Sequence, residues 1–129
     1  MNESTGIHLD DIGQIAITVS DLAQAKQFYG EILGMKFLFD AGSMAFFQCA
    51  SIRLLIGTGE PGATAGTGTI LYFRVSDLPA VHRNLRSKDV QFRQEPHLVA
   101  HMKTHDLWIA FLSDPSGNLL GLMSEVPRA

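Results

Sequence analysis

A four-residue sequence, Val-Ser-Asp-Leu, occurs twice in the chain, at residues 19–22 and again at 75–78. Before each copy lies a short run rich in β-branched and aromatic residues, 15–18 and 71–74, which is typical of a strand. After each copy, apolar residues recur at three- and four-residue spacing, the period of a helix with one buried face. The sequence therefore predicts two copies of one strand–turn–helix unit.

Start and stop signals support both helices. The Ser-Asp pair of each repeat can supply a side-chain oxygen to orphan N–H groups of the first helical turn, and Pro79 is tolerated in that turn because its missing N–H needs no partner. Gly34 can end the first helix in a left-handed conformation. Further apolar or β-branched runs predict three strands after each helix, at 35–39, 45–49 and 52–56, and at 90–92, 107–112 and 119–123.

Each half of the chain thus reads as βαβββ, and the predicted fold class is α+β with two such modules. Module one spans about residues 12–56 and module two about residues 70–126, within a single domain of residues 1–129. The intervening segment 57–69 contains five Gly and one Pro without periodicity, which indicates a linker. The segment 114–118, Asp-Pro-Ser-Gly-Asn, predicts a tight turn that joins the last two strands.

Composition excludes several classes of function. With 46% hydrophobic and 18% charged residues, the chain can bury a core rather than remain disordered. A formal net charge of -3 with scattered basic residues argues against nucleic acid as a partner. No apolar run is long enough for a membrane span, and the polar N-terminus does not resemble a signal peptide. A single cysteine, Cys49, fits a reducing compartment, so we expect a cytoplasmic protein with Cys49 as a small apolar residue of a strand.

Three histidines follow one another at four-residue spacing, His97, His101 and His105. On a helix, neighbouring pairs would share one face and could bind zinc. Pro96 and the predicted strands on both sides instead favour a long hairpin or a loop that covers a pocket. These histidines are either ordinary solvated groups, or His101 or His105 contacts a ligand or acts as a general acid/base with Asp106 as an orienting carboxylate.

His105 is the stronger candidate of the two, because it borders the strand that carries Trp108. Trp108 is either a core residue, which we favour, or a wall on which a ligand stacks. Arg53 faces either solvent, which we favour, or a pocket in which it could bind a carboxylate. Alternation along the strand places Arg53 on the face opposite to the core residue Leu54. We assign His82 to a helix surface.

The repeat, the helix that ends Ile-Leu-Gly-Met at 32–35, and the late sequence Phe-Leu-Ser-Asp-Pro-Ser-Gly-Asn at 111–118 together resemble the vicinal oxygen chelate superfamily. That group includes glyoxalase I, bleomycin-resistance proteins, fosfomycin-resistance enzymes, extradiol dioxygenases and methylmalonyl-CoA epimerase. The resemblance covers about residues 12–126. It implies curved mixed sheets around a cavity, and often a twofold homodimer.

Metal-using members of that superfamily place ligands at four sheet positions. Here the resemblance assigns three of them to Gln14, Ile70 and Gly121, and the fourth to the segment 52–56, which has no carboxylate, His or Cys. Gln14 is therefore the one matching position, as either a pocket residue or a polar strand entry. A lone neutral amide cannot hold a divalent ion. We therefore predict no cofactor, although a divalent metal bound through loop residues stays an alternative.

We expect a protein that binds a small amphipathic molecule between the modules without the family metal, with Gln14, Arg53, His105 and Trp108 as candidate ligand contacts. The alternative is a metal-dependent lyase, isomerase or dioxygenase that acts on a substrate with vicinal oxygens. A third hypothesis is metal-free acid–base catalysis by His105 or His101. The sequence leaves open whether the protein is an enzyme, what its ligand is, and whether the pocket lies within one chain or across a dimer.

Overall fold

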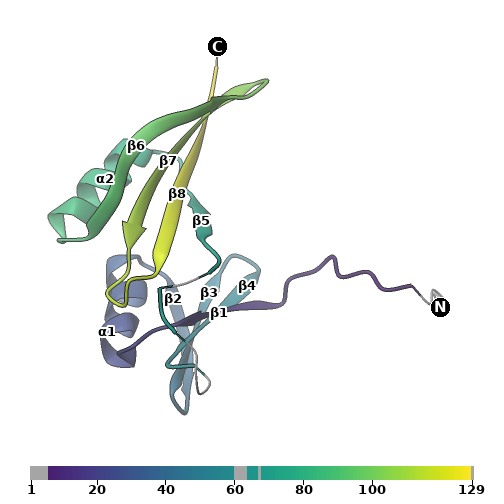
Figure 1. Cartoon of the computed structure of the whole chain (residues 1–129), viewed down its shortest axis with the longest axis vertical. Helices are drawn as coiled ribbons and strands as arrows, with labels where there is room; N and C mark the ends of the chain where they lie inside the picture. The colour runs from purple at the N-terminus through teal and green to yellow at the C-terminus, as the bar shows by residue number, and fades with distance from the viewer. Residues whose placement is uncertain (1–5, 60–63, 67, 129) are drawn as a thin grey trace.

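The computed structural model describes residues 6–59, 64–66 and 68–128, and it contains two βαβββ modules in succession (Figure 1). The predicted fold class is confirmed. Module one comprises β1 (Gln14–Thr18), α1 (Leu22–Lys26) with its π-helical continuation η1 (Gln27–Ile32), β2 (Lys36–Ala41), β3 (Met44–Cys49) and β4 (Ile52–Gly57). Module two comprises β5 (Leu71–Arg74), α2 (Leu78–Ser87), β6 (Gln91–His101), β7 (His105–Ser113) and β8 (Leu119–Pro127).

Each module contains one four-stranded mixed sheet with the same strand order. The orders are β1-β4-β3-β2 and β5-β8-β7-β6, so the first strand of each module lies beside the last. These neighbours, β1 with β4 and β5 with β8, run parallel, and the other pairs are antiparallel. The helix that crosses from the first strand to the second makes this parallel pairing possible. The two sheets therefore repeat one topology, as the sequence repeat predicts.

The helices begin and end where their signals place them. The Asp21 carboxylate accepts the backbone N–H of Gln24 at 3.0 Å, and the Asp77 carboxylate accepts that of Ala80 at 3.1 Å. Gly34 follows the first helix with φ of 77°, a left-handed conformation that favours glycine. The two copies of the repeated sequence are therefore the N-terminal caps of α1 and α2.

Each sheet is covered by its helix on one face only, and in Figure 1 both helices lie on the left of their strands. Side chains at alternate positions on the covered faces, including Leu54, Phe47, Leu112 and Leu122, are buried and join one apolar cluster with the helices. The residues between them in sequence lie on the opposite face, which no helix covers among the described residues. This opposite side is called the open face of each sheet below.

The two modules meet where the β7–β8 turn contacts the start of α1. Asp114 is 4% exposed, and its carboxylate accepts the hydroxyl of Tyr29 at 2.7 Å. The side-chain amide of Asn118 donates to the backbone oxygen of Thr18 at 2.8 Å, and the hydroxyls of Ser20 and Ser116 lie 3.2 Å apart. The predicted turn at 114–118 is confirmed, and it also joins module two to module one.

The strands of module two extend well beyond the predicted runs. The prediction at 90–92 becomes β6, Gln91–His101, and the prediction at 107–112 becomes β7, His105–Ser113. The histidine segment is therefore the long hairpin, and not a pocket-covering loop. Pro96 is accommodated because β6 is an edge strand with shifts in its register between Phe92 and Gln94, Gln94 and His97, and Leu98 and Ala100.

Part of the predicted linker lies outside the described residues, namely positions 60–63 and 67. Its first residue, Gly57, is the last residue of β4, and Gly66 donates its N–H to the Asn118 side chain at 2.7 Å. Among the helices that the structure describes, none is long and apolar enough to cross a membrane.

Candidate functional site

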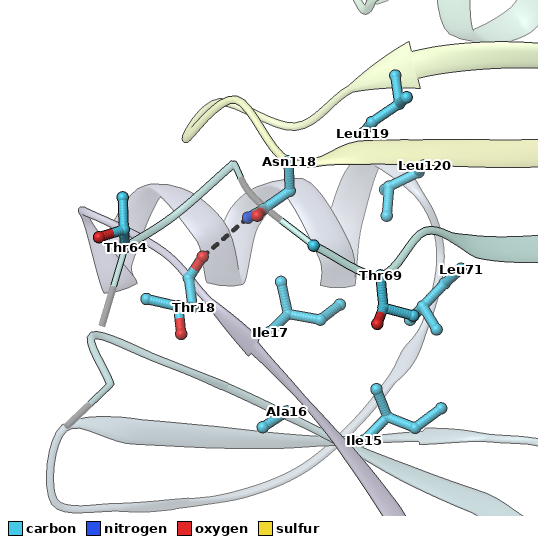
Figure 2. Close-up of a pocket in the computed structure, with 11 residues that line it drawn as sticks. Ile15, Ala16, Ile17, Thr18, Thr64, Thr69, Leu71, Asn118, Leu119 and Leu120 are labelled. Atoms are coloured by element: carbon cyan, nitrogen blue, oxygen red, sulfur yellow. Dashed lines mark hydrogen bonds between the residues drawn. The ribbon is translucent and has the colours of Figure 1, made fainter. Parts of the chain in front are cut away.

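A pocket of about 320 Å³ lies between the two modules (Figure 2). Strand β1 forms one side, from Ile15 to Thr18, and the starts of β5 and β8 form the other, through Leu71, Leu119 and Leu120. The amide of Asn118 reaches across to the backbone oxygen of Thr18 at one end of the pocket. Because Ala16, Thr18 and Leu119 belong to the open faces, the pocket adjoins the open faces of both sheets.

The open face of sheet one brings Gln14 and Arg53 together. They are register partners on β1 and β4, and the Arg53 guanidinium donates to the Gln14 side-chain oxygen at 3.4 Å. The guanidinium also lies 5.9 Å from the ring centre of Phe46, which stacks on Phe39 at 4.6 Å. A cation beside two aromatic rings can bind the anionic group of an amphipathic molecule whose apolar part contacts the rings.

The open face of sheet two carries an aromatic pair beside a glycine. Tyr72, Gly121 and Phe111 are neighbours in register on β5, β8 and β7. The Tyr72 ring contacts the Phe111 ring edge-on at 5.7 Å and lies across Gly121, where an added Cβ would be 2.5 Å from the ring. Tyr72 is 46% exposed, so its other side is available to a ligand.

A charged cluster extends this open face toward the end of β8. The Arg74 side chain pairs with Glu125 at 3.2 Å, and the second Glu125 oxygen lies 3.5 Å from Nε2 of His105. His105 is therefore beside Glu125 on the open face. A carboxylate at this distance can orient the imidazole ring.

His101 and Asp106 form a different cluster at the end of the β6–β7 hairpin. Nδ1 of His101 lies 2.7 Å from the Asp106 carboxylate, which also accepts the Arg128 guanidinium at 2.6 Å. Hydrogen bonds from His101 and then from Arg128 hold the pKa of Asp106 below its usual value of 3.8. Asp106 therefore orients His101 and not His105.

Two further predicted positions lie on the helix-covered side of sheet two. Trp108 is half-buried and packs against the core, as favoured, but it also lines a separate pocket beside the start of α2. The assignment of His82 to a helix surface is wrong. Its side chain is 18% exposed, contacts the Phe92 ring edge-on at 4.6 Å, and places Nε2 2.8 Å from Glu95. It packs between α2 and β6.

The positions at which the resemblance expects metal ligands hold a poor set of donors. The Gln14 amide is bonded to a guanidinium, which would repel a metal cation. Tyr72 lies across the Gly121 position. Among the described residues, no three His, Cys, Asp or Glu side chains are grouped so that they could hold a metal ion. The residues present therefore do not fit the family metal.

The predicted site residues thus separate into distinct places. Gln14 and Arg53 are together on sheet one, and His105 is on the open face of sheet two. His101 is at the end of the β6–β7 hairpin, and Trp108 is on the helix-covered face of sheet two. Sequence patterns did not single out the aromatic residues of the open faces, Tyr72, Phe111, Phe39 and Phe46, because each also fits a core position of a strand. Alternation counted from the buried Phe47 and Leu112 would have placed their neighbours Phe46 and Phe111 on the opposite face.

Comparisons with known proteins agree with this architecture. Residues 11–122 match the sequence model of the Glyoxalase/Bleomycin resistance protein/Dioxygenase superfamily. A member of that superfamily from Sphaerobacter thermophilus is similar in structure, with a TM-score of 0.76 and 22% identity over 91% of this chain and 98% of that one. TnmS3, an antibiotic binding protein from Streptomyces sp. CB03234, has a TM-score of 0.75 and 24% identity over 93% of this chain and 99% of that one.

A lactoylglutathione lyase from Agrobacterium tumefaciens is also similar, with a TM-score of 0.72 and 18% identity over 89% of this chain and 93% of that one. At such identities, likeness of structure establishes the fold alone. Comparison with curated proteins finds no match.

Proposed function

Since this chain belongs to the Glyoxalase/Bleomycin resistance protein/Dioxygenase superfamily, we propose that it binds a small amphipathic molecule between its modules, without the metal that many members use. The chief support is the Gln14–Arg53 pair on the open face of sheet one. A positive side chain there favours an anionic ligand and opposes a metal ion. The antibiotic binding protein TnmS3 shares this fold and supports a binding role by analogy.

The proposed ligand has an aromatic body and an anionic group. Its body contacts the pocket between β1 and β5, and also the aromatic rings of the open faces, such as Phe46 and Tyr72. Its anionic group binds the Arg53 guanidinium, which is exposed and forms no salt bridge among the described residues. The flat rings suit an aromatic body, and the planar guanidinium suits a planar carboxylate.

Calorimetry with a matched pair of compounds tests this assignment. We expect 2-naphthoate to bind more tightly than the uncharged 2-naphthalenemethanol, and Arg53→Gln to weaken naphthoate about tenfold while leaving the alcohol unchanged. Arg83→Gln, on the exposed surface of α2, is the control. The role of Arg53 would be contradicted if Arg53→Gln lost the same affinity for both compounds, or if the unaltered protein bound both compounds equally well.

Metal content separates the two main hypotheses. We expect protein purified without chelator and without a His tag to retain no stoichiometric Zn, Ni, Mn or Fe after loading, because the donor set at Gln14, Ile70 and Gly121 is inadequate. Retention of one ion per chain would reject the metal-free proposal. It would favour a metal-dependent lyase, isomerase or dioxygenase.

One observation favours catalysis as a second candidate function. His105 lies 3.5 Å from Glu125 on an open face that also carries Tyr72, so it can exchange a proton with a bound molecule. If any compound is turned over, we expect His105→Ala to reduce kcat and His101→Ala, at the hairpin end, to leave it nearly unchanged. Full activity in His105→Ala would remove this candidate.

We further propose that residues 1–129 act as one domain, which forms a homodimer in the cytoplasm. The hydrogen bond between the modules from Tyr29 to Asp114 supports the single domain. The exposed side chains of Ile7, Leu9 and Ile12 on the segment before β1 support association with a second copy. Sedimentation equilibrium should give the mass of two chains. A monomer at all accessible concentrations would reject the dimer.

A further inference from the structure

A second pocket, of about 380 Å³, lies beside the start of α2 on the helix-covered side of sheet two. It is separate from the proposed ligand site, since Trp108 and Ser124 face it and their neighbours in sequence face the opposite side. Its walls are mostly apolar and come from α2, β6, β7 and β8, namely Leu78, Pro79, Pro96, Trp108 and Val126. The indole of Trp108 is the largest surface on which a flat group could stack.

The pocket contains a hydroxyl that has no hydrogen-bond partner among the described residues. Ser124 is 2% exposed and lines the pocket, yet its hydroxyl forms no hydrogen bond within residues 6–59, 64–66 and 68–128. Ser124 therefore offers a hydrogen-bonding group to a molecule that enters beside Trp108.

The charge of the pocket is negative. Asp77 is the one charged residue among those that line it. The free N–H groups at the start of α2 carry roughly half a positive charge, but the capping carboxylate of Asp77 carries a full negative charge at the same place. The carboxylate exceeds the helix dipole, so the pocket favours a cation, and the face of Trp108 favours one as well.

The corresponding position in module one is closed by the protein itself. There, the Ser116 hydroxyl accepts the backbone N–H of Ser20 at 2.9 Å and lies 3.2 Å from the Ser20 hydroxyl. The β7–β8 turn thus covers the start of α1. At the start of α2, Ser76 and Asp77 line the pocket instead. The pocket is therefore a property of module two and not of the repeated sequence.

We propose that this pocket is a second binding site, for a small organic cation with a flat aromatic body. The ring stacks on Trp108 between Pro79 and Pro96. The ammonium group binds the Asp77 carboxylate, and Ser124 contributes a hydrogen bond. This site lies on the other side of sheet two from the one proposed for the anionic amphipathic ligand, and it does not depend on that function.

Trp108 is the only tryptophan in the chain, so its fluorescence reports directly on this pocket. The probes are three compounds of similar shape, which are protonated 2-phenylethylamine, neutral 2-phenylethanol and anionic phenylacetate. We expect the amine to change the Trp108 fluorescence in a saturable way, with half saturation at a concentration about fivefold lower than for the alcohol. Phenylacetate should give no saturation. No saturable change with the amine, or a preference for phenylacetate, would overturn the proposal.

Two substitutions locate the charge and the hydroxyl. Asp77→Asn keeps an oxygen that can cap α2, so it should remove the preference for the amine without loss of helix. Asp21→Asn, at the cap of α1, is the matched control and should leave the preference intact. Ser124→Ala should weaken all binding about threefold. A preference for the amine that persists in Asp77→Asn would overturn the assignment.

A further variant distinguishes this site from the proposed anion site. Arg53→Gln should leave the amine titration unchanged, whatever its effect on 2-naphthoate. In an NMR titration with 2-phenylethylamine, the chemical-shift changes of the backbone amides should be largest at residues 76–80, 108 and 124. Shifts confined to β1 and β4, or loss of the amine signal in Arg53→Gln, would show that the cation binds elsewhere and would overturn the second site.

Discussion

Asp114 is a buried carboxylate whose neighbours explain why it is tolerated. Its oxygens accept the Tyr29 hydroxyl at 2.7 Å, the backbone N–H groups of Ser116 and Asn118 at 2.9 and 2.8 Å, and the Asn118 amide at 2.8 Å. A charge removed from water is stable only when such donors replace its hydration. Three of these four donors come from its own turn, and the Tyr29 hydroxyl comes from the other module.

Tyr29→Phe should therefore lower the free energy of unfolding by about 1–3 kcal/mol, because Asp114 loses one donor. Urea denaturation measures this loss. Tyr72→Phe is the control, since Tyr72 is half-exposed and its hydroxyl can bond to water. An unchanged unfolding free energy in Tyr29→Phe would show that the remaining donors suffice for Asp114.

The same pair predicts a dependence on alkaline pH. Burial, and then the adjacent Asp114 carboxylate, raise the pKa of Tyr29 well above its usual value of 10.0. Above about pH 10 the unfolded chain has released this proton and the folded chain retains it, so the unfolding free energy falls as pH rises. We expect the stability advantage over Tyr29→Phe to shrink between about pH 9 and about pH 11. A constant difference across that range would contradict the raised pKa.

Gly121 is required by the Tyr72 ring rather than by a turn. A Cβ at this position would lie 2.5 Å from Cδ2 of Tyr72, which is too close for the ring to stay in place. We expect Gly121→Ala to lower the free energy of unfolding by about 1–3 kcal/mol. When Tyr72 is already replaced by Ala, the same substitution should leave the free energy of unfolding unchanged or raise it. A double-mutant cycle measures this coupling. Additive effects would show that the two residues act independently.

The hairpin formed by β6 and β7 is fastened at its end by one residue that follows β8. Arg128, just after β8, donates its guanidinium to the Asp106 carboxylate and to the backbone oxygens of Met102, Lys103 and His105. One side chain thus replaces water for three carbonyl groups at the hairpin end. Because the same guanidinium binds a carboxylate, its geometry is fixed.

Arg128→Ala should loosen this hairpin end without unfolding the sheet. We expect amide exchange at 102–106 to accelerate about tenfold or more, and exchange in the middle of β7 to stay slow. Arg86→Ala, which removes an ion pair between α2 and β6 instead, is the control and should leave the hairpin end protected. Equal acceleration in both variants would indicate a general loss of stability.

At the scale of the whole molecule, the β7–β8 turn couples the two modules. Asn118→Ala removes one hydrogen-bond donor to Thr18 and one to Asp114. We therefore expect the free energy of unfolding to fall by about 1–3 kcal/mol. Trp108 fluorescence, which reports on module two, should then detect unfolding at a different urea concentration from circular dichroism, which reports on both modules. Coincident transitions in this variant would show that other contacts suffice to couple the modules. Asn84→Ala, on the surface of α2, is the control.

Much of this fold was predictable, because its determinants are local. Capping by Asp21 and Asp77, the left-handed Gly34 and the 114–118 turn each follow from a side chain and its near neighbours. The extent of β6 was not predictable, since Pro96 and polar residues oppose a strand unless the segment is a sheet edge with irregular register. Tertiary pairing with β7 overrides these local preferences.

The candidate site was predicted only in part, for a similar reason. Gln14 and Arg53 were both named from the sequence, but their contact depends on the parallel register of β1 and β4. The sequence linked Asp106 with either His101 or His105. The structure pairs Asp106 with His101, and the register of β7 against β8 brings Glu125 close to His105. Residues adjacent in a strand point to opposite faces, so adjacency in sequence is a poor guide to contact within a sheet.

Local signals along the chain specify the two βαβββ modules, their helix caps and the turn before β8, because these depend on hydrogen bonds and packing among residues close together in the chain. Tertiary structure alone decided which side chains share a face, where the modules join, and that Tyr72 covers Gly121 and Trp108 lines a pocket behind the sheet. Those features depend on strand register and on contacts between distant segments, which local preferences do not specify.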